Sequence, residues 1–257
     1  MVVAGQWADV GAPLLELALS GKVKVAARVP ESWVGRFTDL ESFTFTYGAS
    51  STVHTAEIYS MQLQAILEAA AHCAKEGIPA QPEIMVPQVC TSQELKRVKS
   101  YVDAVQEVVE NKYGMKVNFK FGSMMEVVRS CMRAGSLAEE AEFFSFGTND
   151  LTQATFSFSR EDAENKFLPM YNRMGILKDN PFEVLDIKGV GKLMQLAVDW
   201  GRSIKPDLNV GICGEHGGHP KSIAFCHDAG LDYVSCSAPR VPVARLAAAQ
   251  ACLKGKK

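Results

Sequence analysis

Two carboxylates in this sequence directly follow short apolar segments that are typical of buried strands. Glu126 follows the segment 115–124, and Asp150 follows the apolar run that ends at Gly147. Parallel strands point the same way, so both carboxylates are predicted at one edge of the sheet. Two carboxylates with room for water are typical of Mg²⁺, a hard cation that takes oxygen ligands. Alternatively, Glu126 caps the helix that follows it and Asp150 caps the next turn.

A cysteine occupies the same kind of position near the C-terminus. Cys236 follows Tyr233-Val234-Ser235, at the end of another strand-like segment. A place at the sheet edge would allow exposure and reactivity. The alternative is a buried, inert thiol, which composition alone favours because the chain holds six further cysteines with no evident role.

The glycine-rich segment 211–220, GICGEHGGHP, also follows a predicted strand and could let backbone amides approach a ligand. It lacks the Gly-Lys-Ser/Thr of a P-loop, and the chain has no dinucleotide-binding glycine fingerprint after a strand. His216 and His219 could form a two-histidine metal site. We regard that site as unfavoured, because no third histidine or cysteine is spaced to join it.

Length and composition are those of a soluble globular protein. The chain has 257 residues, 47% of them hydrophobic and 22% charged, with a formal net charge of −2. This balance predicts no nucleic-acid partner and no attraction to an anionic membrane. No apolar run reaches the roughly 18–20 residues that span a bilayer, and the N-terminus is a poor signal peptide. Seven scattered cysteines without a CxxC pair predict reduced thiols and an intracellular, cytoplasmic or organellar (plastid or glycosome) location.

From residue 55 onward, predicted strands and helices alternate. The strands begin near residues 83, 116, 142, 208 and 232, and a capping box at Thr91–Glu94 begins a helix that runs to about Tyr113. The other predicted helices cover 55–76, 127–139, 183–203, 220–230 and 242–253, and 148–182 is predicted as a long connection.

Such alternation with nearly continuous apolar strands predicts an α/β fold with a parallel sheet. Periodicity does not separate a doubly wound sheet from most of a (β/α)8 barrel. In the first 50 residues, 22–29 and 37–53 are candidate strands.

Five motifs occur together and in a fixed order: PEIMVPQV, Met125-Glu126 with Arg129 three residues on, FFSFGTNDLTQ, GICGEHGG, and GLDYVSCSAPRVPVARLAAAQ. Over about residues 55–253 they make the chain resemble the C-terminal phosphoenolpyruvate/pyruvate-binding domain of the pyruvate, phosphate dikinase family. The resemblance implies a (β/α)8 TIM barrel over residues 51–257. Residues 1–50 would be a divergent N-terminal segment that completes the barrel or leaves it open.

The resemblance also implies a site. Glu126 and Asp150 would be the Mg²⁺ ligands, and Thr148 and Asn149 would bind pyruvate or phosphoenolpyruvate with them. Cys236 would be the general acid/base at the methyl carbon. Mg²⁺ would stabilise the enolate, which exchanges a phosphoryl group with a phosphohistidine on another domain.

The sequence lacks cationic side chains that the resembled family carries. The segment before residue 55 reads FTYGASSTV where the family carries an arginine, and upstream of residue 55 only Arg28 and Arg36 occur. Phosphoryl transfer depends on such cations. The nucleotide-binding and phosphohistidine domains are also absent from these 257 residues, so the isolated chain is not expected to convert ATP, phosphate and pyruvate. The alternative is a catalytically impaired barrel fragment that serves as a structural or interaction module, whose open strand edges a partner or second copy would cover.

Overall fold

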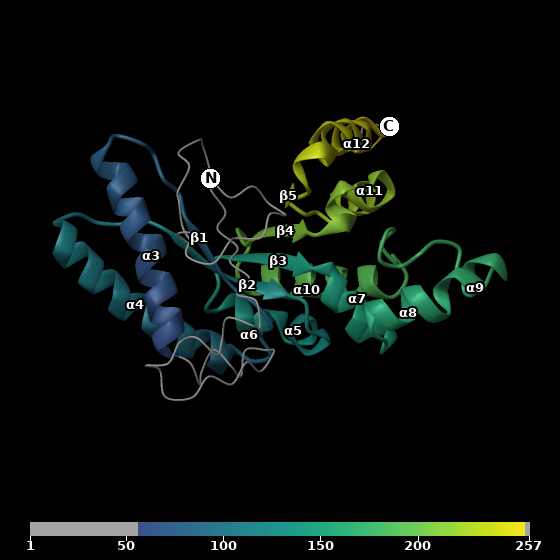
Figure 1. The fold of residues 1–257 in the computed structure, drawn as a ribbon, viewed down its shortest axis with the longest axis horizontal. Coiled ribbons are helices and arrows are strands. Elements are labelled where there is room, and N and C mark those ends of the chain that lie inside the picture. Colours follow the sequence, from purple (N-terminus) through teal and green to yellow (C-terminus); the bar gives the residue numbers. More distant parts are fainter. Residues whose placement is uncertain (1–55, 255–257) are drawn as a thin grey trace, which may run out of the picture.

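The computed structural model describes residues 56–254, which form an α/β fold with five parallel strands (Figure 1). The α/β class and the parallel sheet are as predicted. The strands proposed at 22–29 and 37–53, and with them Arg28 and Arg36, lie outside the described residues. The strands are β1 (Glu83–Val86), β2 (Lys120–Met125), β3 (Phe143–Gly147), β4 (Asn209–Cys213) and β5 (Tyr233–Val234).

The strand order in the sheet is β1-β2-β3-β4-β5, so each strand pairs with the next one along the chain. All four pairings are parallel, with Phe146 opposite Met125 on one side and Ile212 on the other. A doubly wound sheet reverses its strand order at a switch point, and this order does not reverse in the described part of the chain. All five strands therefore end at one edge, where β1 and β5 are the outermost of the described strands.

Helices surround the sheet. In Figure 1, α5, α6 and α10 lie below it, α3 and α4 lie beyond β1, and α8 and α9 extend away at the opposite end. Helix α10 packs on α5 and α6, α3 packs on α4, and α11 packs on α12. The helices are α3 (Ala56–Lys75), α4 (Ser92–Tyr113), α5 (Val128–Met132), α6 (Ala134–Ala138), α7 (Thr148–Phe156), α8 (Arg160–Lys166), α9 (Leu168–Arg173), α10 (Val190–Ile204), α11 (Pro220–Asp228) and α12 (Val241–Lys254), with 3₁₀ turns η1 (Glu215–Gly218) and η2 (Ala238–Arg240). None of the helices within 56–254 has both the length and the apolar character needed to cross a bilayer.

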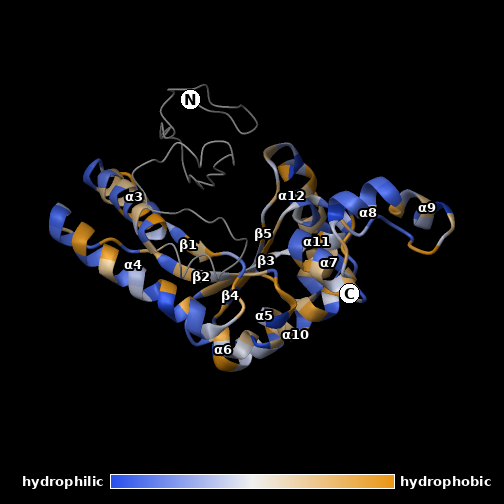
Figure 2. Ribbon diagram, turned by 60° about the horizontal axis from the view of Figure 1, so that its bottom comes forward, coloured by the Kyte–Doolittle hydropathy of each residue, from blue (hydrophilic) through white to orange (hydrophobic). Residues whose placement is uncertain are grey.

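The core is centred on β3, whose five residues are all buried. Phe143 and Phe144 point to opposite faces because side chains alternate along a strand. Gly122 on β2 makes room for the Phe143 ring, since a Cβ at this position would lie 2.5 Å from it. Along α3 and α4, apolar and polar residues alternate, as expected for helices that bury one face (Figure 2). The sheet edge that carries the polar residues is thus supported by rigid, buried strands.

The capping box predicted at Thr91 is confirmed. The Thr91 hydroxyl accepts from the Glu94 main-chain N–H, and the Glu94 carboxylate accepts from the Thr91 main-chain N–H. Helix α4 ends at Gly114, whose φ of 67° is in the left-handed region that glycine adopts without strain. Local sequence therefore determines both ends of this helix.

Several predicted boundaries were wrong. Strand β2 begins at Lys120 rather than near 116, because the preceding segment is held by α4: the Val117 main-chain N–H donates to Glu110. The helix predicted over 127–139 is two short helices separated at Arg133, whose φ of −123° is not helical. The predicted connection 148–182 contains α7, α8 and α9, and the helix predicted from 183 begins only at Val190.

Candidate functional site

Glu126 and Asp150 lie together at the carboxyl edge of the sheet. Glu126 directly follows β2, and Asp150 is in the first turn of α7, which begins where β3 ends. Because β2 and β3 are paired neighbours, the two side chains leave the sheet on the same side. Glu126 is buried and Asp150 is half-buried. The sequence prediction that the two strand ends bring these carboxylates together agrees with this geometry.

The Glu126 carboxyl is in an unfavourable place for a negative charge. Burial raises its pKa to about 7, the main-chain N–H of Gln88 lowers it, and the nearby Asp150 carboxylate raises it further. A buried carboxylate whose pKa is raised by a second carboxylate beside it is a typical environment for a divalent cation, whose charge offsets the repulsion. Within residues 56–254, no group of three or more His, Cys, Asp and Glu side chains could hold a metal. The pair with water and substrate oxygens nonetheless fits Mg²⁺, which commonly takes one or two carboxylates.

Gln88 connects the two carboxylates, and the sequence analysis did not assign it a role. Its main-chain N–H donates to Glu126 Oε1 at 2.7 Å, and its side-chain Nε2 donates to Asp150 Oδ2 at 2.8 Å. Its φ is 53°, in the left-handed region. Its place two residues after the end of β1 was the available signal, because every strand of a parallel sheet ends at this edge.

Thr148 and Asn149 begin α7 and make contacts with the segment that follows β4. The Asn149 Nδ2 donates to Glu215 Oε2 at 2.7 Å, and Asn149 Oδ1 is buried without a hydrogen-bond partner among the described residues. The buried Thr148 hydroxyl lies 2.7 Å from His216 Nδ1 and 3.4 Å from the Cys213 carbonyl oxygen. The Thr148 hydroxyl is thus engaged within the protein, whereas the Asn149 amide retains an unused acceptor.

The side chain of His216 is buried and bonded to neighbouring groups of the protein. Its Nε2 lies 2.9 Å from the Pro181 carbonyl oxygen, which can only accept, so Nε2 carries the proton and Nδ1 accepts from Thr148. Burial lowers its pKa and keeps the ring neutral. Both ring nitrogens of His216 are therefore engaged within the protein.

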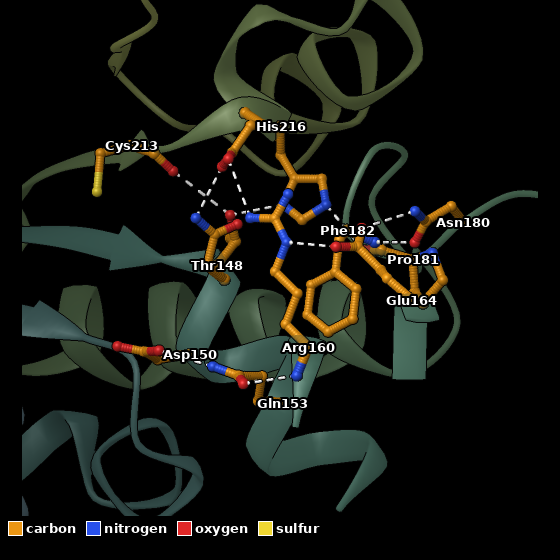
Figure 3. A network of polar contacts seen from close by, with 12 residues as sticks. Thr148, Asp150, Gln153, Arg160, Glu164, Asn180, Pro181, Phe182, Cys213 and His216 are labelled. Carbon is orange, nitrogen blue, oxygen red and sulfur yellow. Dashed lines mark hydrogen bonds and ion pairs between the residues drawn. The ribbon is translucent and has the colours of Figure 1, made fainter. Parts of the chain in front are cut away.

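Arg160 brings a cation to this network, and the sequence analysis did not identify it (Figure 3). Its guanidinium donates to Glu164 at 3.1 Å and to Glu215 at 3.0 Å, and it lies 5.3 Å from the centre of the Phe182 ring. Burial raises the pKa of Glu215, but hydrogen bonds from Asn149 and Arg160 hold it below its ordinary value. The expected shortage of cations rested on the residues before 55, whereas Arg160 begins α8, the helix that follows the one containing Asp150.

Gln153 links Arg160 to the carboxylate pair. Its Nε2 donates to Asp150 Oδ1 at 3.0 Å, and its Oε1 accepts from the Arg160 main-chain N–H at 2.8 Å. The amide is therefore fixed at both ends, with its N–H side turned towards Asp150.

Cys236 lies two residues beyond β5 and is half-buried. It packs beside the cluster of Ile223, Ala244 and Ala247 on α11 and α12. Strands β3 and β5 are separated by β4, so about 10 Å of sheet lies between the strands that lead to Asp150 and Cys236. Cys236 therefore lies at the same edge of the sheet as the two carboxylates.

A sequential parallel sheet with polar side chains gathered at its carboxyl edge defines an α/β protein with a candidate ligand site at that edge. The family described as PEP-utilising enzyme, PEP-binding domain, matches residues 46–253. The chain therefore belongs to this family.

The similar curated proteins are pyruvate, phosphate dikinases. That of Entamoeba histolytica is 50% identical over 244 residues, which cover 94% of this chain and 28% of that protein. The chloroplastic enzyme of Mesembryanthemum crystallinum is 56% identical over 194 residues, 76% of this chain and 20% of that protein. That of Clostridium symbiosum is 52% identical over 210 residues, 81% of this chain and 24% of that protein. The chain thus spans about a quarter of the length of these relatives.

Proposed function

We propose that this chain is a phosphoenolpyruvate/pyruvate-binding domain that binds Mg²⁺ at Glu126 and Asp150 and interconverts the two substrates with a phosphohistidine on another domain. The observation that carries the proposal is that buried Glu126 and half-buried Asp150 lie side by side at the carboxyl edge of the sheet, in a chain of the PEP-utilising enzyme family. The proposed fold is a (β/α)8 barrel over residues 51–257, which residues 1–50 complete. The sequential order of the five described strands supports it.

Each residue has a proposed role. Glu126 and Asp150 would hold the cation, which when bound supplies Lewis-acid polarisation of the substrate's carboxylate and carbonyl oxygens. Asn149 would bind the substrate through its side-chain amide, beside the engaged hydroxyl of Thr148. Cys236 would carry the proton to and from the methyl carbon, a general acid/base task that a thiol can perform.

Calorimetry tests this proposal directly. The chain should bind oxalate or phosphoenolpyruvate with measurable heat in Mg²⁺ and with none in EDTA. Asp150→Ala should abolish the Mg²⁺-dependent heat, whereas Asp199→Ala, which removes an exposed carboxylate on α10, should not. Absence of heat in the unmodified chain, or equal heat in Asp150→Ala, would refute the proposal.

A second candidate function is a structural or protein-interaction module. Exposed apolar side chains on two helices favour it: Val243, Leu246 and Leu253 on α12, and Met170 on α9 with Met174 just after it. This candidate predicts no ligand heat in calorimetry and a stable complex with another chain in size-exclusion chromatography with light scattering. Ligand heat from a monomer would rule it out as the main function.

A further inference from the structure

Gln88 makes contacts with the carboxylate pair that resemble those of a cation. One residue donates to Glu126 from its main chain and to Asp150 from its side chain, at 2.7 and 2.8 Å. These N–H groups place partial positive charge against both carboxylates. Gln88 is thus the residue that joins the two proposed ligands.

Gln88 adopts a backbone conformation that is disfavoured for a residue with a side chain. A φ of 53° is disfavoured for any residue with a Cβ, and such positions persist when the surroundings stabilise them. The described contacts of Gln88 that can do so are the two bonds to the carboxylates and a 3.8 Å contact from the Cys90 thiol to its carbonyl oxygen. Weakening the bond to Asp150 therefore removes one of the described interactions that hold Gln88 itself in this conformation.

A cation and the Gln88 amide compete for Asp150. Mg²⁺ binds carboxylate oxygens at about 2.0–2.1 Å, so an ion on Asp150 Oδ2 would face the hydrogens of Gln88 Nε2. The main-chain N–H can remain on Glu126, because it donates to Oε1 alone, whereas both oxygens of Asp150 accept from amide groups. Gln153 differs from Gln88: its amide also donates to Asp150, but on Oδ1, and its other end is fixed by Arg160.

We propose that the side-chain amide of Gln88 competes with a divalent cation for Asp150. The amide bonds to Asp150 when no cation is bound, and a bound cation displaces it. This inference rests on the proposed function and adds to it a residue that sets cation affinity. It predicts that the hydrogen bond from Gln88 to Asp150 lowers the affinity of the chain for a divalent cation.

The test measures Mn²⁺ binding from the electron paramagnetic resonance signal of the free ion. Gln88→Leu should bind Mn²⁺ about three- to tenfold more tightly than the unmodified chain, because one hydrogen bond to a charged group no longer has to break. Gln88→Gly removes the same amide and adopts φ 53° without strain, so it serves should the leucine variant fail to fold. The matched control Gln153→Leu should give no gain, since that amide positions Asp150 without blocking it.

A second readout follows the amide itself. With ¹⁵N-labelled glutamine, the side-chain signal of Gln88, assigned by its absence from Gln88→Leu, should shift on addition of Mg²⁺. If unmodified protein binds Mn²⁺, Asp150→Ala loses it, and both Gln88 variants bind no more tightly than the unmodified chain, the inference is wrong and the proposed function stands. If the unmodified chain binds no Mn²⁺, both are wrong.

Discussion

The side chain of Asn149 donates to Glu215 across the ends of two neighbouring strands, at 2.7 Å, while its own oxygen is buried without a hydrogen-bond partner among the described residues. Glu215 also accepts from Arg160. One carboxylate therefore holds both the amide proposed to bind substrate and the guanidinium of Arg160. Glu215 thus has two opposing effects on the binding of an anionic ligand. It orders the Asn149 side chain, but it also neutralises the positive charge of Arg160.

Replacing Glu215 with Gln should tighten the binding of an anion. The variant keeps an oxygen that can accept from Asn149 but removes a negative charge from beside Arg160. We expect Mg²⁺-dependent oxalate affinity to rise about three- to fivefold, a modest effect because the group is partly exposed. Calorimetry measures it. Glu164→Gln is the matched control, since it removes the other carboxylate on Arg160 but does not contact Asn149; a rise of equal size there would mean that only the charge of Arg160 matters.

Gly147→Ala should displace the Glu126 carboxylate by a steric clash, without changing any charge. A Cβ at this position would lie 2.8 Å from Met124 Sδ and would overlap the Glu126 carboxylate. We expect a loss of about 1–3 kcal/mol in the free energy of unfolding, typical of overpacking, and a Mn²⁺ affinity reduced at least tenfold. Gly135→Ala on α6 meets only ordinary contacts at 3.4 Å and should change neither. Denaturant unfolding and Mn²⁺ titration provide the two measurements.

The sequence was enough to predict the two carboxylates of the site, but not the residues that connect them to each other and to the rest of the network. Glu126 and Asp150 were predictable, because a buried parallel strand determines the edge at which the next polar residue emerges. Gln88 was not, since its role depends on a left-handed φ and on two partners 38 and 62 residues away. Arg160 was missed for a similar reason: the helices α7 and α8 are short, and their periodicity is too brief to distinguish them from a loop.

Glu126→Gln should stabilise the cation-free protein in a pH-dependent way. The folded-state pKa of Glu126 is about 7, above its ordinary 4.5, so its contribution to stability is full below pH 4.5 and is lost as pH rises through 7. A glutamine carries no charge at any pH. At pH 8 we therefore expect a gain of about 1–3 kcal/mol in the free energy of unfolding, and at pH 4 no gain. Urea unfolding at both pH values, in EDTA, measures the difference, and an equal gain at both would contradict it.

Cys236→Ala should separate proton transfer from binding. Because the thiol lies about two strands from Asp150, its removal should leave Mg²⁺-dependent oxalate affinity within a factor of two. Exchange of the pyruvate methyl protons with D₂O, followed by NMR, should slow by about 10²–10⁴-fold if Cys236 carries the proton. Cys213→Ala is the control thiol at the end of β4, and it should retain exchange. Loss in the Cys213 variant instead would move the proton carrier to that residue.

His216→Phe should change the acid sensitivity of the fold. Burial depresses the pKa of His216 below its ordinary 6.5, so the stability due to its neutral form is full above pH 6.5 and is lost as pH falls through the folded-state pKa. The variant also leaves Thr148 and the Pro181 carbonyl without their bonds, which should cost about 2–4 kcal/mol at pH 8. Its unfolding free energy should then fall less between pH 7 and pH 5 than that of the unmodified chain. His227→Gln, which replaces an exposed histidine, should match the unmodified chain in both respects. Parallel pH curves for His216→Phe and the unmodified chain would contradict the prediction, because they would mean that folding does not change the pKa of His216.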